Sequence, residues 1–255
     1  MRLDLPGAPA TLKGPTQIAR ARTEGWTVRN LFCPNCPSDR LHPFIANNPA
    51  ADLFCGDCSA QYELKAHRRP VQARLVNGAY ATLVARLASD AAPNLLLMTY
   101  DPVPGSVRAL TVIPRRFLHP SIVEKRPPLA ATARRAGWVG SIIRLDLVPQ
   151  TGRIEIVRKG CVVGRDEVRR EWKRTAFMDQ TGVEARGWLA DVLACVDDLG
   201  SDTFSLADIY AFEDRLKALH PGNRNVRPKI RQQLQVLRDN GLLIFEGRGR
   251  YRRKR

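Results

Sequence analysis

The apolar positions in the first two thirds of the chain predict a mixed core of strands and helices. Unbroken apolar runs over residues 95–100 and 107–113, with a shorter run over 154–157, are typical of buried strands. Between residues 77 and 91, apolar residues recur at every fourth position, which indicates an amphipathic helix. The residues of this stripe are Ala79, Leu83 and Leu87. Strands and helices mixed in this way favour an α/β fold.

From residue 186 the pattern becomes helical. One helix is predicted over residues 187–199, and a second over residues 205–220 begins with the sequence of a capping box. A third helix is predicted over residues 228–240, with proline at its favoured first position and glycine just beyond its end. Residues 242–255 then predict two short strands around a Gly-Arg-Gly turn.

Three helices followed by a basic hairpin are the arrangement of a winged helix, whose third helix enters the major groove of DNA. The polar face of the third predicted helix carries glutamines, which can read adenine, among arginines and lysines, which bind phosphate or guanine. We therefore predict a DNA-binding domain over residues 185–255, after a first domain over residues 1–184. The candidate DNA-binding residues of this module are Lys229, Arg231, Gln232, Gln235, Arg248 and Arg250.

The charge of the chain supports a nucleic-acid partner. Its 255 residues include 41 Lys and Arg against 25 Asp and Glu, which gives a net charge of +16 and a pI near 10.3. Residues 224–255 hold eleven of the basic residues and two acidic ones, whereas residues 185–223 have a net charge of −4. Neutralisation of phosphates by concentrated positive charge supplies most non-specific affinity for DNA. A basic surface without a partner is the plainer alternative.

Nothing in the sequence predicts a membrane or secretory location. No apolar run approaches the roughly 18 residues that span a bilayer, and residues 1–14 lack the apolar stretch of a secretory signal. We therefore expect a cytoplasmic protein with no membrane partner. No protein partner is implied.

Four of the six cysteines form two C-x-x-C pairs, CPNC and CGDC, which are separated by eighteen residues. This spacing is typical of a four-cysteine zinc site that leaves no open coordination position. Disulfides are disfavoured because nothing marks the chain as secreted, and a redox C-x-x-C would explain only one pair. We predict a structural zinc ion held by Cys33, Cys36, Cys55 and Cys58. The two remaining cysteines, Cys161 and Cys195, are expected to be ordinary buried thiols.

A second set of reactive groups overlaps the cysteine pairs. The segments before and after the second pair are predicted antiparallel strands, which would bring Asp52 beside Glu63 and Lys65. The two carboxylates and the backbone carbonyl of Leu64 can hold Mg²⁺, which prefers oxygen ligands and lowers the pKa of a bound water. A lysine can orient that water. This is the D-x(n)-E-x-K pattern of PD-(D/E)XK nucleases, and it predicts phosphodiester hydrolysis. The alternative is a solvated hairpin face.

Two segments rich in proline and arginine, residues 114–120 and 123–138, are predicted loops that face the phosphates. The second loop contains Arg134 and Arg135, which we assign as candidate DNA-binding residues.

Taken together, these residues resemble the DpnI family of methyl-directed type II restriction endonucleases. The resemblance is carried by WTVRNLFCPNC, ADLFCGDCSAQYELK, NGAYATLVARLASDAAPN, KRPPLAATARRAGWVG, KIRQQLQVLRDNG and GRGRYR, which together span both predicted domains. It implies an N-terminal PD-(D/E)XK domain with structural zinc, a C-terminal winged helix, and cleavage of double-stranded DNA at GATC sites that carry N6-methyladenine. It also places the catalytic trio on Asp52, Glu63 and Lys65, and the zinc ligands on the four paired cysteines.

The methyl group itself suggests a role for Trp138. A flat indole can pack against a methylated base edge while the neighbouring arginines hold phosphates. We therefore include Trp138 among the candidate DNA-binding residues; the alternative is a core residue beneath its loop.

Two other functions are compatible with parts of the sequence. A non-catalytic DNA-binding regulator, with a zinc ribbon fused to a winged helix, would have no need of the carboxylate and lysine set. An RNA-processing nuclease would digest structured RNA instead of methylated DNA.

Overall fold

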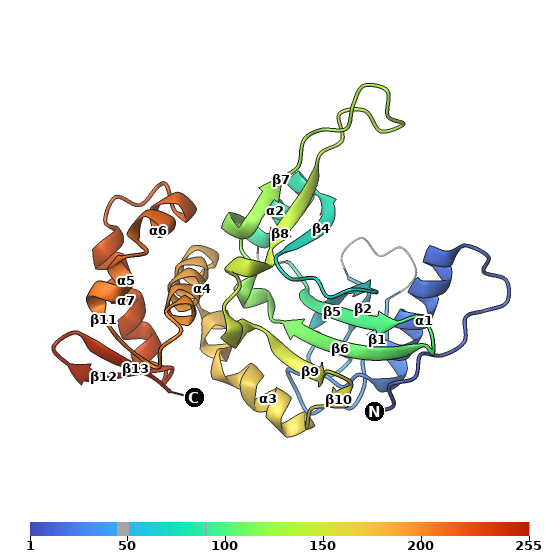
Figure 1. The fold of residues 1–255 in the computed structure, drawn as a ribbon, viewed down its shortest axis with the longest axis horizontal. Helices are drawn as coiled ribbons and strands as arrows, with labels where there is room; N and C mark the ends of the chain where they lie inside the picture. The colour runs from blue at the N-terminus through green and yellow to red at the C-terminus, as the bar shows by residue number, and fades with distance from the viewer. Residues whose placement is uncertain (45–50, 90, 255) are drawn as a thin grey trace. The chain divides into compact units, whose positions relative to one another are not determined.

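The two long apolar runs form neighbouring strands of a seven-stranded sheet in the computed structural model, which describes residues 1–44, 51–89 and 91–254 (Figure 1). The sheet order is β1-β2-β3-β5-β6-β9-β10, and β3 and β5 are its parallel pair. The strands are β1 (His42–Pro43), β2 (Leu53–Phe54), β3 (Gln61–His67), β5 (Asn94–Asp101), β6 (Ser106–Ile113), β9 (Ile154–Arg158) and β10 (Cys161–Val162). The prediction of a mixed α/β fold is confirmed.

Helices α1 (Pro15–Asn30) and α3 (Arg165–Arg174) contribute to the core against this sheet. Trp26 of α1 and Trp172 of α3 are buried with apolar residues of the central strands. The hydrophobic pattern did not predict α1, because its other buried residues are threonines. The hydroxyls of Thr23 and Thr27 donate to the carbonyls one turn earlier, at 2.9 and 2.8 Å, so they can be buried without losing a hydrogen bond.

The chain divides into two compact units, each built from several stretches. Unit 1 comprises Met1–Gln72, Ala92–Arg115 and Arg153–Thr175, and unit 2 comprises Ala73–Ala91, Arg116–Gly152 and Ala176–Arg255. The seven-stranded sheet belongs to unit 1, and the C-terminal module belongs to unit 2. The predicted boundary between residues 184 and 185 falls within the first turn of a helix, α4 (Val183–Asp198), and stays a prediction.

Unit 2 contains a second sheet, of order β4-β8-β7, that the sequence pattern did not predict. Its strands are β4 (Arg74–Ala79), β7 (Val123–Lys125) and β8 (Gly140–Arg144). The predicted helix over residues 77–91 is present as α2 (Tyr80–Ala88), which begins later because residues 77–79 pair with β8. Pairing with a distant strand has therefore overridden the local helical pattern at this end.

The C-terminal module has the predicted helices and basic hairpin, with one further strand, but the third helix begins at Val226, so Pro228 is not its first residue. Its elements after α4 are β11 (Thr203–Ser205), α5 (Leu206–Tyr210), α6 (Glu213–Leu219), α7 (Val226–Asp239), β12 (Leu243–Gly247) and β13 (Arg250–Arg253). The predicted second helix is divided into α5 and α6, and β11 adds to the hairpin in the order β11-β13-β12. The predicted capping box is confirmed: Ser205 Oγ accepts from the Asp208 N–H, and Asp208 Oδ2 accepts from the Ser205 N–H.

The apolar face of α7 anchors it in this module. Ile230, Leu234 and Leu237 are fully buried, and Gly241, with φ of +74°, ends the helical segment in a conformation that favours glycine. Across the residues that the structure describes, no helix is long and apolar enough to cross a membrane.

Two expectations about individual segments were wrong. Residues 114–120 do not form a phosphate-facing loop, because Arg116 is buried and its guanidinium lies 2.5 Å from Asp179 Oδ2. Cys161 is exposed in the short edge strand β10, whereas Cys195 is buried as predicted. Around residues 114–120 the chain instead forms two short 3₁₀ segments, Arg115–Phe117 and Pro120–Ile122, which bury Phe117 and Ile122. The other 3₁₀ segments of the described residues are Leu145–Leu147, Gln150–Gly152 and Ala176–Gln180.

Candidate active site

The predicted hairpin around the second cysteine pair is present. Leu53 of β2 pairs with Tyr62 of β3 in antiparallel register. The N–H of Asp52 donates to the carbonyl of Tyr62 at 3.0 Å, so Asp52 lies beside β3, next to the residue that precedes Glu63. Two hydrogen bonds close the hairpin: the Cys55 N–H donates to the Ala60 carbonyl at 2.9 Å, and the Ser59 N–H donates to the Cys55 carbonyl at 3.0 Å. The local chain alone therefore brings Asp52 to β3.

Strand β3 has an edge that β2 leaves uncovered, because β2 is only two residues long. At this edge the carboxylate of Asp52 replaces a strand partner: its Oδ2 accepts from the Leu64 N–H at 2.8 Å. Backbone polar groups alternate in direction along a strand. Because the Tyr62 carbonyl and the Leu64 N–H both face Asp52, the carbonyl of Leu64 also faces this uncovered edge.

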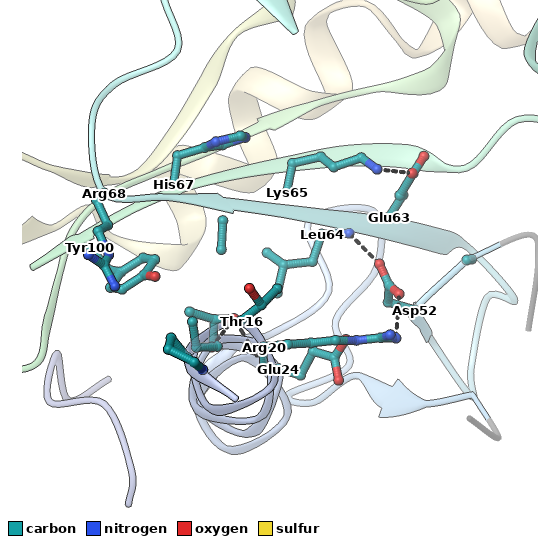
Figure 2. A pocket seen from close by; sticks show the side chains of 15 residues that line it. Thr16, Arg20, Glu24, Asp52, Glu63, Leu64, Lys65, His67, Arg68 and Tyr100 are labelled. Carbon is teal, nitrogen blue, oxygen red and sulfur yellow. Dashed lines mark hydrogen bonds and ion pairs between the residues drawn. The ribbon is translucent and has the colours of Figure 1, made fainter. Parts of the chain in front are cut away.

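Side chains of β3 alternate between its two faces, as predicted. Glu63 and Lys65 project from one face, where the Lys65 Nζ lies 2.7 Å from Glu63 Oε1 (Figure 2). Tyr62 is buried on the other face. Both side chains of the ion pair are about three-quarters buried, with 26% of Lys65 and 22% of Glu63 exposed.

Asp52, Glu63 and Lys65 line one cavity of about 620 Å³ along the uncovered edge of β3 (Figure 2). Helix α1 forms another wall of the cavity. The complete lining is Pro15, Thr16, Ala19, Arg20, Thr23, Glu24, Ala51, Asp52, Glu63, Leu64, Lys65, Ala66, His67, Arg68 and Tyr100. The structure therefore brings together the three residues that the sequence grouped.

Two charged residues of α1, Arg20 and Glu24, line the cavity but were not predicted from the sequence as site residues. Arg20 Nε donates to Glu24 Oε1 at 2.6 Å, and Arg20 Nη2 lies 3.8 Å from Asp52 Oδ1. The helical spacing of Thr16, Ala19 and Arg20 puts them on one face of α1. This spacing does not reveal that the face lines a cavity until α1 is placed against β3.

His67 is a third titratable group on β3 that lines the cavity. Burial, and then the positive charge of Lys65, lower the pKa of His67. Its ring is therefore predominantly neutral near pH 7.

The oxygen donors of the cavity suit a hard divalent cation. Asp52 and Glu63 offer carboxylates in the same cavity, and the carbonyl of Leu64 faces the same edge. These are the ligand types that Mg²⁺ prefers. In the protein alone, Lys65 and Arg20 lie beside the two carboxylates and balance their charge.

The four paired cysteines form a cluster that fits zinc. Their sulfur atoms all lie within 4.8 Å of one another. Cys33 and Cys58 are 3.6 Å apart, and Cys36 and Cys55 are 3.5 Å apart, measured between sulfurs. Tetrahedral zinc with Zn–S bonds of about 2.3 Å needs sulfurs about 3.8 Å apart. The cluster therefore needs little adjustment to accept the ion.

The environment of Cys55 favours the thiolate over the thiol. Burial raises the pKa of this thiol, but hydrogen bonds from the backbone N–H groups of Cys58 and Asp57, together with the neighbouring cysteines, outweigh burial and bring the pKa to about 7. A thiolate is the form that binds zinc.

Neighbouring side chains connect the cysteine cluster to the sheet and to α3. The hydroxyl of Tyr62 lies 3.3 Å from Cys33 Sγ. The Asn35 amide donates to Cys58 Sγ at 3.3 Å, and Trp172 Nε1 donates to Asn35 Oδ1 at 2.9 Å. Such outer contacts orient metal ligands. Because Tyr62 directly precedes Glu63, the cluster also supports the strand that lines the cavity.

The predicted DNA-binding residues of the C-terminal module lie on its surface. Lys229 is partly buried on α7, and the exposed residues on α7 and in the hairpin include Arg231, Gln232, Gln235, Arg248 and Arg250. Arg231 donates to the hydroxyl of Tyr210 on α5 at 3.1 Å. None of these residues lines the cavity of unit 1.

The remaining candidates belong to the loop between β7 and β8 in unit 2 (Figure 1). Arg134 and Arg135 are exposed, and Trp138 is half-buried at the base of the loop. The Arg135 guanidinium lies 5.0 Å from the centre of the Trp138 ring. A Cβ at Gly140 would come within 2.9 Å of that ring, so the absence of a side chain at Gly140 lets the indole approach the backbone there. Trp138 is thus neither fully exposed nor a buried core residue.

Comparison with known families covers nearly the whole chain. Residues 9–181 match the model of the DpnI family, described as the Dam-replacing family, and residues 184–253 match its C-terminal domain, described as the Dam-replacing HTH domain. Together these matches support a DNA-binding protein with a nuclease function. The first match contains the cavity, the cysteine cluster and the loop of Trp138; the second contains α7 and the basic hairpin. The chain belongs to the Dam-replacing family, with a nuclease-type α/β domain and a C-terminal winged helix.

Proposed function

We propose that this protein is a type II restriction endonuclease that cleaves double-stranded DNA at GATC sites containing N6-methyladenine. The observation that carries the proposal is the convergence of Asp52, Glu63 and Lys65 on one cavity of a chain in the Dam-replacing family. A DNA-binding regulator would not need two carboxylates and a lysine at the uncovered edge of a strand.

The residues of the cavity have distinct roles in this proposal. Asp52, Glu63 and the carbonyl of Leu64 would hold Mg²⁺, which when bound stabilises charge on the phosphate and supplies an acidified water. The ammonium of Lys65 orients the attacking water by hydrogen bonding. The attacking water gives up a proton to solvent as its oxygen bonds to phosphorus, the bond from phosphorus to one ester oxygen breaks, and that oxygen takes up a proton from solvent and becomes the hydroxyl end of one DNA strand. Lys65 also balances the negative charge that develops on the phosphate.

The cysteine cluster has a structural role in this proposal. Zinc held by Cys33, Cys36, Cys55 and Cys58 would have no open position for a substrate. It would instead join the segment before β1 to the turn between β2 and β3. The ion would therefore help to hold Asp52 beside β3, where its carboxylate accepts from the Leu64 N–H.

The winged helix supplies sequence reading. No acidic residue occurs between residues 228 and 238, and the exposed face of α7 carries Gln232 and Gln235. Glutamine can bind adenine through N6 and N7 in the major groove. Arg248 and Arg250 lie in the hairpin, which follows the DNA backbone in a winged helix.

Discrimination of the methyl group requires more than one contact. A hydrophobic pocket gains about 1–3 kcal/mol from one small apolar group, which corresponds to a preference of roughly 10–200-fold. A GATC site offers one methyl group on each strand. Separate contacts by α7 and by the loop of Trp138 would multiply two modest preferences, one at binding and one before cleavage.

Replacing Trp138 with alanine should leave the fold intact and lower the preference for methylated over unmethylated DNA by about tenfold or more. The indole would lose its contact with the methylated base edge, whereas its half-buried position gives it a limited share in the core. Cleavage rates on methylated and unmethylated GATC duplexes measure the preference. Leu129→Ala is a matched control, because Leu129 is a partly exposed apolar residue of the same loop. A lowered Tm with unchanged methyl preference would show that Trp138 acts in packing.

The proposed function is tested with plasmid DNA that carries methylated GATC sites. Incubation with Mg²⁺ should give discrete fragments, whereas EDTA or unmethylated plasmid should give none. Binding without cleavage under all metal conditions would favour a regulator. Digestion of structured RNA with intact methylated plasmid would favour an RNA-processing nuclease.

A further inference from the structure

The face of helix α1 that lines the cavity combines small side chains with two long charged ones. The cavity-lining residues from its first turns are mostly small, including Thr16, Ala19 and Thr23. Arg20 and Glu24 are the long charged side chains that α1 contributes to the lining (Figure 2). The small residues leave space above the helix, and the guanidinium of Arg20 crosses this space towards Asp52.

The contacts that Arg20 makes with residues 1–44, 51–89 and 91–254 leave part of its guanidinium available. Glu24 binds Nε at 2.6 Å, which fixes the direction of the side chain. Nη2 is 3.8 Å from Asp52 Oδ1, which is longer than a hydrogen bond. With 61% of its side chain exposed, Arg20 can adjust its position at the mouth of the cavity.

The oxygen of Asp52 nearest to Arg20 is also the one available to a cation, because Oδ2 already accepts from the Leu64 N–H. A divalent cation bound at Oδ1 would repel the guanidinium, since both are positive. A phosphate that enters beside that cation would attract it. The forked donors of arginine match phosphate oxygens in pairs.

We propose that Arg20 is a further catalytic residue that binds the scissile phosphate, and that Glu24 is the positioning residue that directs it. This inference rests on the proposed nuclease function. In the protein alone Arg20 balances the charge of Asp52; with DNA and cation present it moves to a phosphate oxygen. Arg20 then stabilises the charge that develops on the phosphate during hydrolysis. It acts from α1, whereas Glu63 and Lys65 act from β3.

The test compares Arg20→Ala and Arg20→Lys with Arg29→Ala in the full-length protein. Arg29 is an exposed arginine in the last turn of the same helix and does not line the cavity. Single-turnover cleavage of methylated GATC duplex at saturating protein should be about 100-fold slower in Arg20→Ala, as for loss of one preorganised donor to a transition state. Arg20→Lys should recover part of the rate, because it keeps the charge without the fork. Arg29→Ala should match the unsubstituted protein.

Two further measurements separate phosphate binding from other roles. Anisotropy titration of the duplex with Ca²⁺ in place of Mg²⁺ should show that Arg20→Ala lowers the salt dependence of binding by about 0.9 in the log–log slope, the value for one phosphate contact. Glu24→Gln should slow cleavage less than Arg20→Ala. Tm should be unchanged in Arg20→Ala, because an exposed i,i+4 ion pair contributes little to the free energy of unfolding.

The outcomes distinguish this inference from the proposed function. An Arg20→Ala variant that cleaves as fast as the unsubstituted protein would overturn the role of Arg20 alone. A lower Mg²⁺ requirement with no loss of rate would also overturn it, since Arg20 would then only compete with the cation for Asp52. An unsubstituted protein that leaves methylated duplex intact with Mg²⁺ would overturn the nuclease function itself.

Discussion

Replacing Lys65 with alanine should slow DNA cleavage by about 100-fold or more, with little change in DNA affinity. The ammonium of Lys65 lies in the cavity, 2.7 Å from Glu63 Oε1, where it can act on the attacking water and not on the bases. An interaction made chiefly in the transition state lowers kcat when it is removed, while KM changes little. Single-turnover cleavage of methylated duplex measures the rate, and anisotropy with Ca²⁺ measures the affinity.

The control for Lys65 is Lys173→Ala, which removes the same charge from an exposed position in the last turn of α3. Removing Lys65 also takes the ion-pair partner from Glu63, so the rate should be measured over a range of Mg²⁺ concentrations. A defect that vanished at high Mg²⁺ would assign Lys65 to cation affinity. Near-normal turnover at every concentration would contradict the PD-(D/E)XK assignment.

Replacing Cys55 with serine should remove bound zinc and lower the Tm of the protein by roughly 10 °C, which corresponds to about 3–5 kcal/mol in a chain of this size. Cys55 is buried in the cluster and begins the turn that joins β2 to β3. Without the ion, the hairpin that carries Asp52 and Glu63 loses its restraint. Cleavage should then be lost because these two carboxylates are no longer held in place. Metal analysis of the unsubstituted protein should find about one zinc per chain.

Cys161→Ser is the matched control, because Cys161 is exposed in β10 and is not part of the cluster. It should keep its zinc, its Tm and its activity. Calorimetry and metal analysis on both variants separate loss of the ion from loss of one thiol. A Cys55→Ser variant with unchanged Tm would contradict the structural role of zinc, as would fully active zinc-free protein.

Several parts of the fold and of the candidate site were predictable from sequence because the interacting residues are near one another in the chain. The second C-x-x-C pair forms the turn between Asp52 and Glu63, and alternation along β3 then separates Glu63 and Lys65 from Tyr62. The capping box at Ser205 and the apolar stripe of α7 are equally local. A helix over residues 228–238 could be predicted, and proposed to bind DNA, because its amphipathic period and absence of acidic residues are properties of one segment.

Only the tertiary structure decided which distant segments complete the cavity. Arg20 and Glu24 reach it because α1 lies against β3, and α1 was hidden from the hydrophobic pattern by buried threonines that hydrogen-bond within the helix. The pairing of β4 and β7 with β8 and the burial of Arg116 against Asp179 also depend on partners far away in the chain. Periodicity reports whether a segment has a face to bury, but not which surface will cover it. The sequence by itself therefore determined the catalytic and zinc-binding candidates, whereas packing between distant elements decided what surrounds them.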